Sequence, residues 1–118
     1  MTDLLHWYAA KLIRVVDGDT VKLAVDVGFG FSFENTFRLA EINCPELPTD
    51  AGKEAKRFTE SWFTQHGGVC IIRSIKLDKY GRYLAHVCNA KEINETLNNT
   101  LVDVGLAVPF MVPGPKKV

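Results

Sequence analysis

The stretch that decides the fold is VKLAVDVGFGFSFENTFRL, residues 21–39. Its odd-numbered positions are almost all apolar, and its even-numbered positions carry most of its polar side chains. This period-two alternation is typical of β-strands that bury one face. Gly28 and Gly30 interrupt the pattern near its centre, which predicts a chain reversal there. The sequence therefore predicts an antiparallel hairpin that joins a strand over about Leu12–Val27 to a strand over about Phe31–Ile42.

The register of this hairpin determines which polar side chains meet. With the turn centred near Phe29, Asp19 lies opposite residues 39–41 and close to Asn43. Arg38 lies on the face opposite the apolar positions, where its side chain is free to meet a ligand. We therefore expect oxygen-bearing side chains and a guanidinium group together at one end of the sheet.

The remainder of the chain alternates turn-forming residues with periodic segments. Prolines end the second strand, and a helix follows whose apolar stripe contains Ala55, Phe58, Trp62 and Phe63. In chain order we expect a loop over Glu46–Gly52, a helix over Lys53–His66 that ends at Gly67-Gly68, strands over Val69–Leu77 and Arg82–Val87, and a short helix over Asn98–Val104.

Length and composition indicate one folded domain. The chain has 118 residues, of which 47% are apolar, and this suffices for a single core over about residues 11–107, followed by an irregular proline-rich tail over about 109–118. Positive and negative side chains balance at 14 each, so any attraction to nucleic acid must come from a local patch. Three cysteines without a C-x-x-C pair disfavour a disulfide framework and a zinc site.

The N-terminal residues carry an early acid and no long apolar run, which is unlike an export signal. No stretch reaches the roughly 18 apolar residues that span a bilayer. We therefore expect no membrane association and a cytoplasmic location, which would suit a phage-encoded or housekeeping protein. The oligomeric state is left open.

Three short motifs carry the chemistry: VVDGDTV at 15–21, FRLAEINCPE at 37–46 and DKYGR at 78–82. Together they supply two arginines, a glutamate beside a proline and an aspartate. Guanidinium groups bind phosphate in a bidentate manner, and a carboxylate can deprotonate a water molecule. A hard cation on oxygen ligands can neutralise the charge of a phosphate. These residue types are those that cleavage of a phosphodiester requires.

In residue identity and in order along the chain, the three motifs resemble those of the staphylococcal nuclease (thermonuclease) family, and the resemblance extends over about Lys11–Ala107. The pattern alone indicates an α+β fold with mostly antiparallel strands. The resemblance implies a five-stranded barrel of the oligonucleotide/oligosaccharide-binding (OB) type with two or three helices.

The resemblance also implies roles for individual residues. Arg38 and Arg82 would hold phosphate oxygens, and Glu46 would activate the attacking water, which leaves a 3′-phosphate. Lys79 and Tyr80 would contact the terminal phosphate of a bound nucleotide.

The same resemblance implies a calcium site. Asp19 would be its first ligand, Asn43 its second, and Cys44 would offer its backbone carbonyl. The best-studied members of the family carry Asp-Thr where this chain carries Asn43-Cys44. Since calcium affinity depends on the number of charged ligands, we expect weaker binding than in an aspartate-bearing relative.

Two main hypotheses follow. The first is a calcium-dependent nuclease acting on DNA, RNA or both, with single strands as the expected substrate. The alternative is a catalytically weak or inactive OB-fold module that binds nucleic acid or a protein partner, which the neutral Asn43 favours. A purely structural interaction domain has no feature in its favour, and neither does a nucleophilic role for Cys44.

Overall fold

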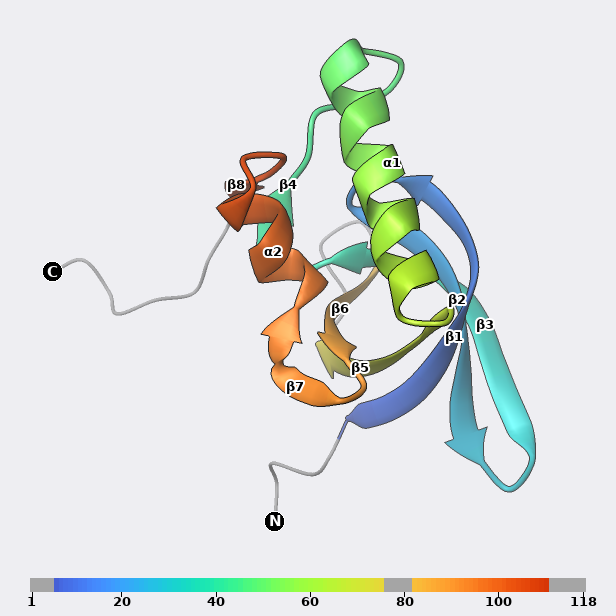
Figure 1. Cartoon of the computed structure of the whole chain (residues 1–118). Helices are drawn as coiled ribbons and strands as arrows, with labels where there is room; N and C mark the ends of the chain where they lie inside the picture. Colours follow the sequence, from blue (N-terminus) through green and yellow to red (C-terminus); the bar gives the residue numbers. More distant parts are fainter. Residues whose placement is uncertain (1–5, 76–81, 111–118) are drawn as a thin grey trace, which may run out of the picture.

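A computed structural model of the chain describes residues 6–75 and 82–110 (Figure 1). Its elements, in chain order, are β1 (Trp7–Asp17), β2 (Thr20–Gly28), β3 (Phe31–Leu39), β4 (Ile42–Asn43), α1 (Asp50–Gln65), β5 (Val69–Ile75), β6 (Tyr83–Asn89), β7 (Glu92–Thr96), α2 (Leu97–Asp103) and β8 (Val108–Pro109).

The main sheet closes into a barrel. Its strand order is β3-β2-β1-β5-β6-β7, and β3 also pairs with β6, which joins the two ends of a five-stranded ring. The β3–β6 pairing is parallel, and the other pairings of the ring are antiparallel. With α1 and α2 packed against it, this is an α+β fold of the OB type, and the fold predicted from the sequence is confirmed.

The register predicted for the hairpin is confirmed, but the extent of both strands was wrong. The strand expected over Phe31–Ile42 ends at Leu39, and after a turn Ile42–Asn43 forms the separate strand β4. Thr20 pairs with Arg38 and Asp26 with Ser32. The strand expected over Leu12–Val27 is in fact two strands, because the chain reverses at Gly18-Asp19. The Asp17 carboxylate stabilises this turn by accepting a 3.2 Å hydrogen bond from the Asp19 amide.

Glycine is required at position 18 because the turn packs tightly against α1. A Cβ atom there would lie 2.7 Å from the Cβ of Ala55 and 3.0 Å from the sulfur of Cys44. The buried Thr59 hydroxyl of α1 also donates a 2.8 Å hydrogen bond to the Gly18 carbonyl. These contacts fix the β1–β2 turn, and with it Asp19, against the helix.

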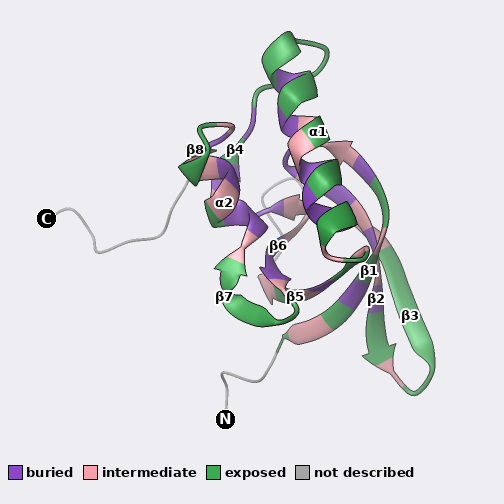
Figure 2. Cartoon of the chain, viewed as in Figure 1, coloured by how far each residue is buried: buried purple, intermediate pink, exposed green. Residues whose placement is uncertain are grey.

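The apolar face of the hairpin is buried only along part of its length (Figure 2). Val21, Leu23 and Leu39 are fully buried in the barrel, whereas Phe29 is 98% exposed and Phe31 70% exposed. The expectation that the apolar face of the hairpin is buried along its whole length was therefore wrong for the residues near the turn, which are exposed. β3 pairs with β6 only from Phe37 onward, so the earlier residues extend beyond the barrel.

Both helices were predicted, with small shifts at their ends. Helix α1 begins three residues earlier than expected, at Asp50, because the Thr49 hydroxyl caps it by accepting a 3.0 Å hydrogen bond from the Gly52 amide. It ends, as expected, before Gly67 and Gly68, which both have positive φ. Its predicted stripe lies inward, with Ala55, Trp62 and Phe63 buried and Phe58 packed at the edge of the core. Neither described helix is long and apolar enough to cross a membrane.

Asn98 of α2 fastens the barrel at the junction of β3 and β6. Its side-chain oxygen accepts a 2.9 Å hydrogen bond from the Val87 amide, and its nitrogen donates to the carbonyls of Ala40 (3.0 Å) and Ala85 (3.2 Å). Asn98 is 1% exposed, so water cannot take its place as the hydrogen-bond partner of these backbone groups. The end of β3 that carries Arg38 is thus held against β6.

Candidate active site

Three predicted site residues meet at the end of β3. The Arg38 guanidinium donates a 2.8 Å hydrogen bond to the side-chain oxygen of Asn43, and the same nitrogen lies 3.6 Å from the Asp19 carboxylate. The strands bring them together, since Thr20 pairs with Arg38 and the Leu39 amide donates to the Asp19 carbonyl at 2.8 Å. The side chains of Arg38 and Asp19 are only 11% and 10% exposed.

The Asp19 carboxylate also fixes the start of the loop after β4. It accepts a 2.9 Å hydrogen bond from the Cys44 amide and one of 3.2 Å from the Thr20 hydroxyl. Asp17 lies beside it, and burial, followed by the hydrogen bond and the charge of Asp19, raises the pKa of the Asp17 carboxyl to about 6. Two carboxyl groups are thus held close together next to one guanidinium.

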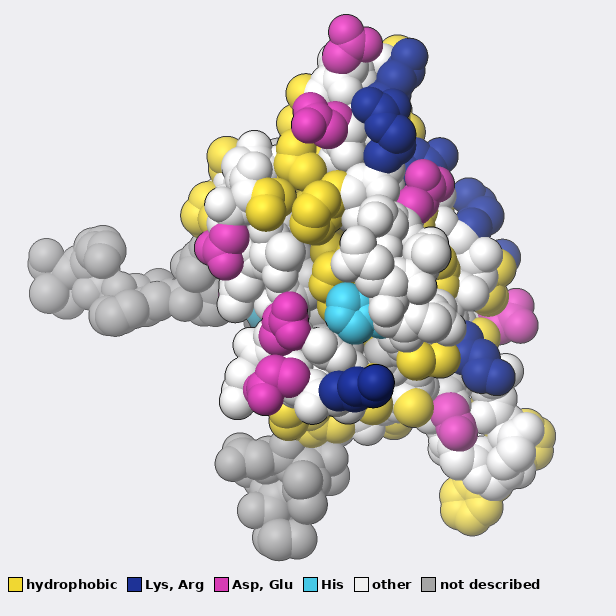
Figure 3. Space-filling view, in the orientation of Figure 1, with side chains coloured by type: hydrophobic (Ala, Val, Ile, Leu, Met, Phe, Trp, Pro, Cys, Tyr) yellow, Lys and Arg dark blue, Asp and Glu magenta, His cyan; other side chains and the backbone are white. Residues whose placement is uncertain are grey.

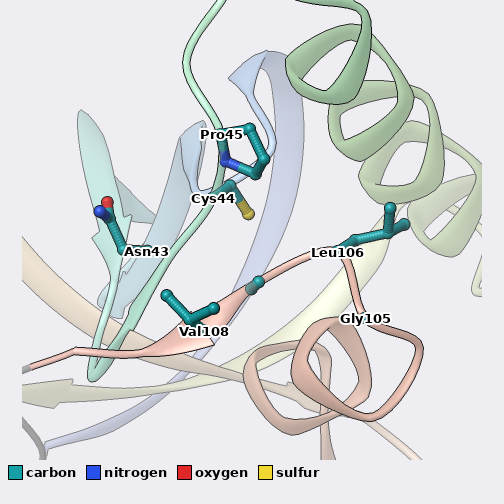
Figure 4. Close-up of a pocket in the computed structure, with 7 residues that line it drawn as sticks. Asn43, Cys44, Pro45, Gly105, Leu106 and Val108 are labelled. Carbon is teal, nitrogen blue, oxygen red and sulfur yellow. The ribbon is translucent and has the colours of Figure 1, made fainter.

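Cys44 contributes its backbone to this cluster, while its side chain faces elsewhere. Figure 4 shows its sulfur pointing toward Leu106, across a pocket of about 260 Å³. The residues that line this pocket are Asn43, Cys44, Pro45, Gly105, Leu106, Ala107 and Val108. Burial, and then the negative charge of Asp19, raises the pKa of the Cys44 thiol to about 12. The thiol is therefore uncharged at neutral pH, which argues against a nucleophilic role.

Arg82 immediately precedes β6, the strand that runs beside Arg38. Tyr83 pairs with Phe37, so Arg82 immediately precedes the paired region of β6, at the same end of the barrel as Arg38. Residues alternate between the two faces of a strand, and the inward positions of β6 include Ala85. Arg82 therefore shares the outward face with Arg38.

Glu46 lies on the loop between β4 and α1, three residues after Asn43, and it is exposed. Its backbone carbonyl accepts hydrogen bonds from the amide and the hydroxyl of Thr49, which anchors the loop to the start of α1. Lys79 and Tyr80, the expected substrate contacts, lie outside the described residues.

Phe110 is a neighbour of the site that the sequence did not single out. Its ring centre lies 5.4 Å from the guanidinium carbon of Arg38, within the range of a cation–π interaction. Its amide donates a 2.9 Å hydrogen bond to the Glu41 carbonyl, which continues the pairing of β8 with β4. Because Phe110 falls in a proline-rich segment, we expected an irregular tail there. An aromatic residue just after a short apolar run was the available signal.

The cluster has oxygen donors suited to a hard cation. Asp17, Asp19, Thr20 and Asn43 offer carboxylate, hydroxyl and amide oxygens, which are ligand types that calcium accepts. Among residues 6–75 and 82–110, no group of three or more His, Cys, Asp or Glu side chains could hold a metal ion. The donor types thus fit calcium, but the number of charged ligands is small.

Comparison with known proteins identifies the family. The family model described as "Staphylococcal nuclease homologue" matches residues 36–117, which include Arg38, Asn43, Glu46 and Arg82. The chain belongs to the staphylococcal nuclease family. The resemblance inferred from the three motifs is therefore confirmed.

A curated relative within this family is a thermonuclease of Staphylococcus hyicus. It is 33% identical over 103 residues, which cover 82% of this chain and 56% of the relative. This staphylococcal nuclease homologue thus spans little more than half the length of that relative.

Proposed function

We propose that this protein is a calcium-dependent nuclease that hydrolyses phosphodiester bonds of DNA, RNA or both. The observation that carries the proposal is the meeting of Arg38, Asp19 and Asn43 at one end of an OB barrel. Membership of the staphylococcal nuclease family supports the same reaction class.

Arg38 and Arg82 would bind the phosphate group. Both lie at the same end of the barrel and on its outward face, and guanidinium groups hold phosphate oxygens in a planar, bidentate way. Their effect on the rate would come from stronger binding as negative charge builds on those oxygens in the transition state.

Glu46 would act as the general base. It would accept a proton from the attacking water as the new oxygen–phosphorus bond forms, while the bond to the 5′ oxygen breaks and that oxygen takes up a proton from solvent. The anchoring of the loop through Thr49 supports a defined backbone position for Glu46, three residues after Asn43.

Asp19 and Asn43, with the backbone carbonyl of Cys44, would hold the calcium ion, and the Asp17 carboxyl beside Asp19 would add a further oxygen donor. When bound, the ion supplies positive charge that stabilises the phosphate oxygens. The chain has no net charge, so substrate binding would depend on this local set of cations. A single-stranded substrate suits this small set of cations, because a few contacts can bind successive phosphates of one nucleic-acid backbone.

The alternative is a module that binds nucleic acid with little or no hydrolysis. One observation favours it: Asn43 supplies no negative charge and already accepts a hydrogen bond from Arg38. Both conditions weaken a cation site.

A cleavage assay distinguishes the two. Purified protein is incubated with single-stranded DNA and with RNA, over a calcium series and with a chelator. Cleavage that requires calcium and is lost in Asp19→Asn supports the nuclease. Binding without cleavage at millimolar calcium supports the module. Asp26→Asn, which changes an exposed aspartate on the same strand hairpin, is the matched control.

A further inference from the structure

A second row of cations lies beside Arg38 on the outer face of the barrel. Arg14 of β1 pairs with Lys22 of β2, and Lys22 pairs in turn with Thr36 of β3. The next outward-facing row toward the barrel end contains Asp17, Thr20 and Arg38. Two residues along a strand advance by about 6.7 Å, so the two rows are close neighbours.

These side chains face away from the core. Each row of partners across a sheet points to one face, and successive rows alternate. The row between them, which joins Val15, Val21 and Phe37, is buried inside the barrel. The rows of Arg14 and of Arg38 therefore both lie on the outer face.

The Arg14–Lys22 pair is electrostatically unfavourable in the protein alone. Like charges directly opposite each other on adjacent strands destabilise a sheet. Within residues 6–75 and 82–110, no Asp or Glu forms an ion pair with either side chain, even though the chain has as many acidic as basic residues. An anion from outside the chain would relieve this repulsion.

The basic surface has clear limits. Figure 3 shows Lys and Arg side chains, with some Asp and Glu side chains between them, from α1 down one edge of the molecule, and the exposed hydrophobic tip of the hairpin below them. The row beyond Lys22 pairs Ala24 with the exposed Lys11 of β1 and with the exposed Glu34 of β3. The next row includes Asp26, so negative charge first appears on the β2–β3 side, toward the hairpin tip. Arg14 and Lys22 are therefore the cations of the outward-facing row next to that of Arg38.

We propose that Arg14 and Lys22 form a second phosphate subsite, which binds the backbone of a single-stranded nucleic acid one phosphate away from the group held by Arg38. This inference deepens the proposed nuclease function and depends on it for the identity of the ligand. Its consequence is substrate length: an oligonucleotide reaches both rows, whereas a dinucleotide with one phosphate reaches only the first.

The test is binding of a fluorescently labelled oligothymidylate by anisotropy over a series of salt concentrations, with a chelator present so that no cleavage occurs. Arg14→Gln and Lys22→Gln, singly and together, are compared with Lys91→Gln on the β6–β7 turn. Each charge that contacts a phosphate should lower the slope of log affinity against log salt by about 0.7. The double variant should thus lose about 1.4, and Lys91→Gln should match the wild type.

A second readout uses catalysis. The double variant should have a higher KM for the oligonucleotide, an unchanged kcat, and unchanged cleavage of a dinucleotide. Its melting temperature should equal or exceed that of the wild type, because the like-charge pair is gone.

The outcomes separate the two proposals. An unchanged salt slope in the double variant, an equal loss in Lys91→Gln, or no binding by the wild type would overturn the subsite. If the wild type cleaves nothing yet the slope falls as expected, the subsite stands and the nuclease proposal fails.

Discussion

The side-chain oxygen of Asn43 accepts a 2.8 Å hydrogen bond from the Arg38 guanidinium. This contact couples Asn43, the proposed calcium ligand, to Arg38, which is proposed to bind the phosphate. An amide oxygen has two lone pairs, so one remains for a cation. Arg38 and a calcium ion would then share a single neutral oxygen and repel each other across it. The Asp19 carboxylate, 3.6 Å from the same guanidinium nitrogen, is the group that moderates this repulsion.

Replacing Asn43 by aspartate should strengthen calcium binding. The carboxylate keeps an acceptor for Arg38 and adds a charged ligand, so the calcium dissociation constant should fall roughly tenfold. Calorimetric titration of calcium into the wild type and Asn43→Asp measures this directly. Equal affinities would mean that position 43 does not face the ion.

Arg38→Lys should remove most of the activity and leave the fold intact. A lysine cannot reach Asn43 and a phosphate with one planar group, and loss of a donor aimed at the transition state lowers kcat by about 100-fold or more. The matched control is Arg73→Lys on β5, where Arg73 is exposed and lies over the Trp7 ring. Equal kcat values for the two variants would remove Arg38 from the mechanism.

Asn98→Ala should destabilise the barrel strongly. The substitution leaves one buried amide and two buried carbonyls without their side-chain partner, and we expect a loss of about 2–4 kcal/mol. Urea denaturation measures it, with the exposed neighbour Asn99→Ala as control. If both variants unfold at the same urea concentration, the three hydrogen bonds contribute little.

The folded protein should lose stability in mild acid because of the buried His86 side chain. Burial lowers its pKa below the usual 6.5, and the nearby Arg73 also lowers it, against the opposing effect of Glu41 at 3.9 Å. The unfolded chain therefore takes up a proton before the folded one does, so stability is lost as the pH falls below about 6.5. His86→Gln should show a smaller drop in melting temperature between neutral and mildly acidic pH, and the exposed His6→Gln should behave like the wild type. Identical pH profiles for His86→Gln and the wild type would contradict this account.

The part of the fold that depends on alternation could be read from the sequence. The register that places Thr20 opposite Arg38 follows from the apolar period and the two glycines, and it brought Asp19 and Asn43 to the same guanidinium group, that of Arg38. The apolar alternation and the glycines are local signals, so they can be recognised in a single sequence.

The parts of the fold and the site that depend on tertiary packing could not be predicted from the sequence. The turn at Gly18 is dictated by the close approach of Ala55, which follows it by 37 positions in the sequence. Strands β7 and β8, and the contact of Phe110 with Arg38, have no periodic pattern of their own and form by pairing with β6 and β4. Asn98 likewise resembles any polar helix residue until its three backbone partners are known.

The most direct test of the central claim is the initial rate of single-stranded DNA cleavage by Glu46→Gln in saturating calcium. The control is Glu54→Gln, an exposed glutamate on α1 that has no role in the proposed reaction. Removal of the general base should lower kcat by about 100-fold or more, while binding of the oligonucleotide is retained. A Glu46→Gln variant that cleaves as fast as Glu54→Gln would contradict the account.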